Sequence, residues 1–364
     1  MAKNNKEVNQ KVNRIIAEDI KNICRNEINF DFFKNKTVLI TGARGGIGSY
    51  LVSAFLYLSK SRYCNIRVLA MCRDLEKSKQ FFEEYANNSN FNLVINNVKE
   101  PFNCINEKVD IIFHTSNSKE VFVSSLKDSN GVYDLIESNI IGFHNVLSAT
   151  KRLKTHMVVL FSSASVYGES DIDSSISESY RSAIDFASVG NTYRICKQMM
   201  EAMANAYKIN NPDLIFRVIR PFTVYGPCLG NASKNNHITD FIKSKLTGQP
   251  VIINSKGSDI RSYLYISDAI EAILHICMHG DENPYNLTSS NVASIKEFAE
   301  IIASYDGEQM PVLIRNKNDA VKRNSIYIGD ATRLKNLGWH EFYTLREGVE
   351  RTINWAKTSN FLNS

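Results

Sequence analysis

The chain has 364 residues, of which 43% are hydrophobic and 22% are charged, and its formal net charge is +5. Because this charge is small for the length and the basic residues are scattered, we expect no nucleic-acid partner. The seven cysteines form no CxxC pair, and no run of 18 apolar residues occurs, so we expect reduced thiols in a cytoplasmic protein without a membrane partner.

Residues 1–34 precede the first predicted strand. Their apolar positions fall on one face of a helix: Val8, Val12, Ile15, Ile16, Ile20 and Ile23. This spacing predicts an amphipathic helix that docks on the body of the protein. Because the segment carries acidic as well as basic residues, a structural cap is a better interpretation than a membrane anchor.

A glycine-rich turn follows the first strand. Val38–Ile40 is typical of a buried strand and Ile47–Phe55 of a helix face, and between them Gly42, Gly45 and Gly48 are spaced as GxxGxxG. The helix N–H groups at such a turn bind anions, most often the pyrophosphate of a dinucleotide. The P-loop pattern is absent, because no Lys-Ser or Lys-Thr follows the glycines. A tight turn without a ligand is the alternative.

Strands and helices then alternate along the chain. Strands are expected over 66–71, 91–95, 109–115, 156–163 and 213–221, and helices over 75–87, 132–153 and 192–210. This alternation predicts a parallel sheet covered by helices on both faces. With the glycine turn after its first strand, the predicted fold class is α/β, a Rossmann-type doubly wound sheet.

The alternation loosens from about residue 228, which predicts a smaller, partly interleaved C-terminal lobe. Helices are expected over 238–248 and 294–306, and a strand that runs into a helix over 263–280. The predicted units are an N-terminal helical extension (1–34), a dinucleotide-binding domain (35–227, to which 263–289 returns) and a substrate-binding lobe (228–262 and 290–364).

The end of the second strand bears on the choice of dinucleotide. An NAD site usually has Asp or Glu there, which binds the ribose 2′-hydroxyl. Here Cys72 and Arg73 occupy this place, and Arg44 lies within the glycine turn. Two guanidinium groups favour a 2′-phosphate and hence NADP. The alternative is NAD, with Asp74 in the role of the acid.

A catalytic site is predicted where the strand over 156–163 meets the helix over 192–210. Ser163 lies at the carboxyl end of the strand over 156–163, where sites of open α/β sheets lie. Tyr193 and Lys197 are four residues apart and share a face of the helix over 192–210. A neighbouring lysine favours the phenolate form of the tyrosine, which can take a proton from a sugar hydroxyl while hydride leaves the same carbon. Ser163 would hold the same oxygen.

Residues 36–350 resemble the extended short-chain dehydrogenases/reductases of the nucleotide-sugar epimerase and dehydratase type. The motifs that carry the resemblance are TGxxGxxG at 41–48, VDIIFHTS at 109–116, SNIIGFHNVL at 138–147, SSASVYG at 162–168, YxxxK at 193–197, RPFTVYGP at 220–227, RSYLYISDA at 261–269, YNL at 285–287 and LKNLGW at 334–339. The resemblance implies a Rossmann domain, a C-terminal lobe, a nucleotide-diphosphate sugar between them, and a homodimer paired through the helices over 132–153 and 192–210.

The family pattern also assigns roles by position. Asn139 matches an asparagine that supports the catalytic lysine, Arg261 an arginine that binds the sugar-nucleotide diphosphate, and Thr223 a position that contacts the sugar nucleotide. The expected cofactor contacts are Gly42, Arg44, Gly45, Gly46, Ile47, Gly48, Arg73, Thr115, Ser116, Asn139, Tyr193 and Lys197, and the expected substrate contacts are Ser163, Ser165, Thr223 and Arg261.

Several reactions share this chemistry. The 4,6-dehydratases carry Asp-Glu after the catalytic serine or threonine, and the UDP-glucuronate decarboxylases usually keep a Glu, whereas this chain has Ala164 and Ser165. The sequence therefore favours a C4 epimerase. The alternatives are an NADPH-dependent 4-keto-sugar reductase, then a UDP-glucuronate decarboxylase. A non-catalytic NADP-binding scaffold or sensor is disfavoured because Ser163, Tyr193 and Lys197 are all present.

Two smaller signals have simpler explanations than catalysis. His275 and His279 are four residues apart on a predicted helix, but no third ligand is evident, so we expect a solvated helix end and no metal site. Cys196 lies beside Lys197, with Met199 and Met200 after it, which favours packing over a nucleophilic role.

Overall fold

The computed structural model describes residues 14–25, 28–116, 129–168, 174–229, 237–315, 325–359 and 361–363. A parallel seven-stranded sheet, in the order β10-β6-β5-β4-β1-β2-β3, forms the centre. Its strands are β1 (Thr37–Thr41), β2 (Arg67–Cys72), β3 (Phe91–Ile95), β4 (Ile111–His114), β5 (Met157–Phe161), β6 (Ile215–Pro221) and β10 (Tyr285–Leu287). The predicted Rossmann-type α/β fold is confirmed.

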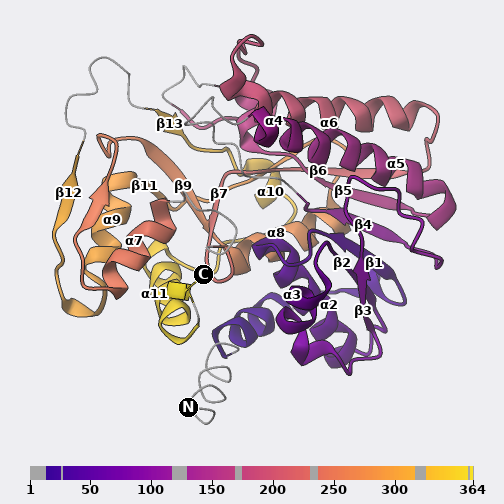
Figure 1. Cartoon of the computed structure of the whole chain (residues 1–364), viewed down its shortest axis with the longest axis horizontal. Helices are drawn as coiled ribbons and strands as arrows, with labels where there is room; N and C mark the ends of the chain where they lie inside the picture. Colours follow the sequence, from indigo (N-terminus) through magenta and orange to yellow (C-terminus); the bar gives the residue numbers. More distant parts are fainter. Residues whose placement is uncertain are drawn as a thin grey trace.

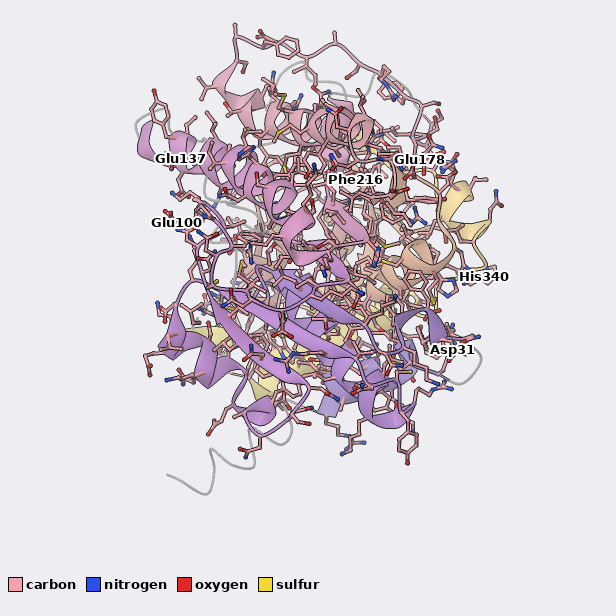
Figure 2. All side chains as sticks on the ribbon, turned by 90° about the vertical axis from the view of Figure 1, so that its right-hand side faces the viewer. Asp31, Glu100, Glu137, Glu178, Phe216 and His340 are labelled. Atoms are coloured by element: carbon pink, nitrogen blue, oxygen red, sulfur yellow. The ribbon has the colours of Figure 1, made fainter. Side chains whose placement is uncertain are left out.

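Helices cover both faces of this sheet (Figure 1). On one face lie α2 (Gly46–Ser61) and α8 (Ile266–His279), with α3 (Leu75–Phe81) nearby; on the other lie α4 (Ser129–Ile136), α5 (Gly142–Leu153) and α6 (Thr192–Ile209). Side chains alternate along each strand, so Val38 and Ile40 of β1 join the core under α2 and α8, while Leu39 joins the core under α5 and α6. Figure 2 shows Phe216 of β6 deep among these side chains, whereas Asp31, Glu100 and His340 lie at the periphery.

Two predicted helices are interrupted. The helix expected over 132–153 consists of α4, a π-helical turn η3 (Glu137–Ile141) and α5. In η3 the Nδ2 of Asn139 donates to the carbonyl of Leu135 at 2.9 Å, so a side chain competes for a carbonyl that a regular helix uses. The helix expected over 75–87 ends at Phe81, and a 3₁₀ turn over Glu83–Tyr85 follows it.

The C-terminal part builds a second layer, seen on the left of Figure 1. A four-stranded sheet contains β7 (Thr223–Tyr225), β9 (Ile260–Tyr265), β11 (Val292–Ser294) and β13 (Ile326–Tyr327), and β8 (Val251–Ile253) pairs with β12 (Val312–Ile314). The helices α7 (His237–Leu246), α9 (Ile295–Ala303), α10 (Thr332–Lys335) and α11 (Leu345–Thr358) accompany them. Because β9 leads directly into α8, the chain returns from this part to the central sheet.

The chain before β1 forms a helix over 14–23. Its Asp19 is fully buried and accepts hydrogen bonds from the Tyr50 hydroxyl (2.9 Å), the Tyr265 hydroxyl (2.8 Å) and Arg351 Nη2 (2.7 Å). These three donors lie on α2, β9 and α11. The carboxylate therefore ties the first helix to α2 and to the C-terminal part at once. Val8 and Val12 of the predicted amphipathic face lie outside the described residues.

In the part of the chain that the structure describes, no helix combines the length and the apolar character that crossing a bilayer requires.

Candidate active site

The glycine turn connects β1 to α2 and needs glycine for two reasons. Gly42 has φ +66°, and a Cβ there would lie 2.8 Å from the Cα of Ser116. A Cβ at Gly48 would lie 2.6 Å from the carbonyl oxygen of Gly42. Gly45 is the N-cap of α2 with no side-chain partner, and Gly46 is its first residue. The turn therefore presents free helix N–H groups at the carboxyl edge of the sheet, as an anion site requires.

Two neighbours complete the turn. Ile47 points into the core that underlies α2. Leu229, which follows β7, packs directly on Gly46, since a Cβ at Gly46 would lie 2.3 Å from the Leu229 Cδ2. The glycine at position 46 thus allows a segment distant in sequence to approach the start of α2, which the spacing of the glycines alone does not reveal.

The end of β2 lies beside the turn. Arg73 follows the strand and is exposed, and the Nε of Arg44 is buried without a hydrogen-bond partner among the described residues. Asp74 caps α3 by accepting from the Lys77 backbone N–H at 3.0 Å. That bond, together with the charges of Lys77 and Arg44, lowers the pKa of the Asp74 carboxyl. Asp74 is therefore engaged as a helix cap.

The end of β4 approaches the turn from the other side. Thr115 Oγ1 donates to the Thr41 carbonyl at 2.7 Å, and the Ser116 N–H lies 3.3 Å from Thr41 Oγ1. His114 is fully buried, with Nδ1 3.0 Å from Thr41 Oγ1. Burial, with a smaller contribution from the Lys197 charge, lowers the pKa of His114 to about 3, so the ring is neutral. His114 belongs to the VDIIFHTS motif, but its position against Lys197 was not predicted.

Ser163, Tyr193 and Lys197 converge on the end of β5. Ser163 caps the short helix η4 (Ala164–Tyr167), and its Oγ accepts from the Ser165 N–H at 3.1 Å. Lys197 is 1% exposed, its Nζ donates to the Phe161 carbonyl at 2.9 Å, and it lies 5.7 Å from the centroid of the Tyr193 ring. Because α6 packs against η4, Lys197 lies beside Tyr193, and the carbonyl that it binds is two residues before Ser163.

Asn139 lies in the π-turn η3, which packs against α6. Its Nδ2 is bound by Leu135, while its buried Oδ1 has no partner among the described residues. The structure thus brings Asn139 to α6, with an acceptor still available. Placing it there requires the helix interruption, which apolar periodicity did not predict.

A buried ionic cluster fixes α6 to the sheet and was not predicted. Glu201 accepts from the Ser162 hydroxyl at 2.6 Å and from Arg220 Nε and Nη2 at 2.9 and 2.6 Å. Ser162 precedes Ser163, and Arg220 lies near the end of β6. A signal was available, since Glu201 continues the Tyr193 and Lys197 face at the next helical turn.

The residues expected to contact the substrate, Arg261 and Thr223, lie on β9 and β7. Arg261 on β9 donates from Nη1 to the Ser325 carbonyl at 3.1 Å and lies 5.7 Å from the centroid of the Tyr327 ring. The Tyr327 hydroxyl donates to the Ala164 carbonyl, so Arg261 is connected to the turn that follows Ser163. Thr223 opens β7, is half-buried and pairs in register with Tyr263 of β9.

The other candidates have ordinary surroundings. Cys196 is buried on α6, as predicted. The rings of His275 and His279 lie 5.9 Å apart, and His279 is exposed. His275 is buried, with Nδ1 3.3 Å from the Leu337 carbonyl, so the predicted solvated helix end is wrong for His275. Across the described ranges, no group of three or more His, Cys, Asp or Glu side chains could hold a metal ion.

Comparison with known proteins identifies the family. The model of the NAD dependent epimerase/dehydratase family matches residues 38–288, and the chain therefore belongs to that family. The predicted family is confirmed, and the chain is an enzyme of the extended short-chain dehydrogenase/reductase type.

Individual relatives span nearly the whole chain. UDP-glucuronic acid decarboxylase 6 of Arabidopsis thaliana is 26% identical over 324 residues, 88% of this chain and 89% of its own. UDP-glucuronic acid 4-epimerase from Bacillus cereus, solved with UDP-4-deoxy-4-fluoro-glucuronic acid and NAD, has a TM-score of 0.74 at 20% identity, over 88% of this chain and 99% of its own. UDP-N-acetylglucosamine 4-epimerase from Methanobrevibacter ruminantium has a TM-score of 0.74 at 19% identity, over 89% of this chain and 99% of its own.

Proposed function

We propose that the protein inverts C4 of a nucleoside-diphosphate sugar. The observation that carries this proposal is the placement of Lys197 beside Tyr193 and at the strand end that leads to Ser163, with Ala164 and Ser165 as the next two residues. Proton and hydride removal at one carbon needs this set. Elimination of a hydroxyl would need an additional acid and base, and neither Ala164 nor Ser165 supplies one.

The residues act in a simple order. Ser163 holds the C4 hydroxyl, and Tyr193 takes its proton, with the Lys197 ammonium favouring the phenolate form. A bound nicotinamide supplies the acceptor and later the donor of the hydride. After the keto sugar has turned its other face toward the hydride donor, Tyr193 returns the proton to the C4 oxygen. Hydride and proton leave and return, so the reaction is an isomerisation without net redox change.

The chain fits a dinucleotide of this kind. The start of α2 offers free N–H groups, and the side-chain-free Gly42 and Gly48 let a pyrophosphate approach closely. We further propose a preference for NADP, supported by Arg73 and by the unpartnered Nε of Arg44, which flank the expected ribose. Asn139, Thr115 and Ser116 would line the nicotinamide end.

The proposed substrate lies between the dinucleotide-binding domain and the C-terminal lobe, with Arg261 toward the diphosphate and Thr223 toward the sugar. The relatives and neighbours named above act on or bind UDP sugars, so UDP is the nucleotide we propose. We also propose a homodimer in the cytoplasm. Exposed apolar side chains on the paired helices support it: Tyr133 is 66%, Ile141 45% and Met199 51% exposed.

Mass spectrometry on UDP, dTDP, GDP and CDP sugars, without added reductant, tests the reaction. We expect a product of unchanged mass and altered chromatographic mobility. The second candidate, an NADPH-dependent 4-keto-sugar reductase, is favoured specifically by Arg44 and Arg73; it predicts a gain of two hydrogens only when NADPH and a 4-keto sugar are supplied. Loss of carbon dioxide from UDP-glucuronate would identify a decarboxylase and contradict the proposal.

A further inference from the structure

We propose that Arg194 and Ser165 form a carboxylate-binding end of the sugar site, and that the sugar is therefore a uronic acid. This inference rests on the proposed function, because it takes Ser163 and Tyr193 as the residues that hold the reacting hydroxyl. It adds the substrate class to that function, which Ser163, Tyr193 and Lys197 do not determine.

The face of α6 that carries Arg194 is directed at the turn after Ser163. Gln198, one turn further along α6, donates from Nε2 to the Val166 carbonyl of η4 at 2.9 Å. Glu201, another turn on, accepts from the Ser162 hydroxyl at 2.6 Å. Residues three and four apart lie on one helical face, so Arg194 continues this face by one turn toward the start of α6, immediately beside Tyr193.

Arg194 has a charge that the described residues leave unbalanced. Its side chain is half-buried, and it forms no hydrogen bond or ion pair with any residue in the described ranges. Its charge acts on Tyr327, where burial raises the pKa of the hydroxyl and Arg194 is the foremost of the cations that oppose this rise. That hydroxyl donates to the carbonyl of Ala164, the residue that precedes Ser165.

Ser165 supplies a second unused donor. Its Oγ is buried and has no hydrogen-bond partner in the part of the chain that the structure describes. Two carboxylates of this region are engaged elsewhere: Glu201 binds Arg220, and Glu178, labelled in Figure 2, accepts from the Asn286 N–H at 3.0 Å. A buried hydroxyl without a partner is uncommon and indicates a ligand that completes it.

The chemistry of the sugar selects the ligand. In a hexose, C6 is two bonds from C4, so a substituent at C6 falls close to the residues that flank Ser163 and Tyr193. A guanidinium with a hydroxyl donor beside it matches a planar carboxylate, which accepts charge-assisted hydrogen bonds from both. A neutral hydroxymethyl group would leave the guanidinium without a counter-charge. The pair thus distinguishes a sugar with a C6 carboxylate from its neutral counterpart.

Binding to the full chain tests the proposal. Isothermal titration calorimetry would compare UDP-glucuronic acid with UDP-glucose, which differ only at C6, on the Tyr193→Phe protein in the presence of NADP. We expect UDP-glucuronic acid to bind at least about tenfold more tightly, a difference typical of a charge-assisted pair. Arg194→Gln should remove this preference and leave the Kd of UDP-glucose within about twofold, while Arg194→Lys should retain part of it.

The controls separate this inference from the proposed reaction. Arg346 on α11 is exposed and forms no hydrogen bond or ion pair with any described residue, so Arg346→Gln should leave the preference unchanged. Equal binding of the two sugars, absence of UDP-glucuronic acid binding, or a preference that survives Arg194→Gln would overturn the inference. Arg194-dependent binding of UDP-glucuronic acid, combined with no C4 inversion by the unsubstituted enzyme, would uphold the inference and reject the proposed function.

Discussion

On the sheet side of the proposed site, Lys197 is held by the Phe161 carbonyl, and Glu201 binds both Ser162 and Arg220. On the side of α6 that faces η4, Arg194 and the Ser165 hydroxyl have no partner among the described residues. The first set is positioned before any ligand binds, and the second is completed only by a ligand. This difference indicates that the chemistry is built into the fold, whereas the choice of sugar depends on a few unsatisfied groups.

The largest effect is expected when the chemical step itself is removed. Tyr193→Phe should lower turnover by about 10³-fold, because the hydroxyl proton of the sugar loses its acceptor. Cofactor affinity, measured by fluorescence titration, should change less than about twofold. The control is Tyr133→Phe, at an exposed tyrosine on α4, which should retain full turnover. Turnover of the Tyr193→Phe protein close to that of the native enzyme would assign the proton transfer to another group.

Measurements of stability test the difference between the two sides of the proposed site. Glu201→Ala leaves Arg220 buried without its carboxylate and should lower the free energy of unfolding by about 3 kcal/mol. Arg194→Gln removes no internal contact and should change it by less than about 0.5 kcal/mol. Urea denaturation followed by circular dichroism measures both values. Equal losses for the two variants would show that Arg194 is as much a structural group as Glu201.

The cofactor preference gives an intermediate effect. Arg73→Ala should weaken NADP binding by about tenfold, because one charge-assisted contact to the 2′-phosphate is lost, and should leave NAD binding nearly unchanged. Lys77→Ala, at an exposed lysine of α3, is the matched control. A parallel weakening of both dinucleotides would place Arg73 near the pyrophosphate instead, and no change in either would remove it from the site.

A separate effect on stability is expected on acidification. His114 is neutral in the folded protein, with its pKa lowered to about 3, whereas an unfolded histidine titrates near its ordinary value of 6.5. The unfolded state therefore binds an extra proton below pH 6.5, and stability should fall as the pH decreases, with a slope approaching about 1.4 kcal/mol per pH unit from this residue. Unfolding midpoints between pH 7 and 5 should depend less on pH in His114→Asn, but not in the exposed His144→Asn. An identical pH dependence in both variants would contradict this account.

Much of the sheet side could be predicted from the sequence, because its signals are local. The glycine turn, the Tyr193 and Lys197 spacing and the alternation of strands and helices each lie within a short window. The π-turn that places Asn139 depends on one side chain that competes with the helix backbone, and apolar periodicity does not report it. Asp19 illustrates the remaining limit, since its donors Tyr50, Tyr265 and Arg351 are distributed over most of the chain length and meet only in the folded state.

The most direct test of C4 inversion is proton NMR of UDP-glucose and UDP-glucuronic acid labelled with deuterium at C4. The purified enzyme would be incubated with substoichiometric dinucleotide. We predict a C4 epimer that keeps its deuterium at C4, with many turnovers per dinucleotide, because the same hydride returns to the carbon it left. Release of carbon dioxide, or no product from either sugar until NADPH and a 4-keto sugar are supplied, would contradict the central claim.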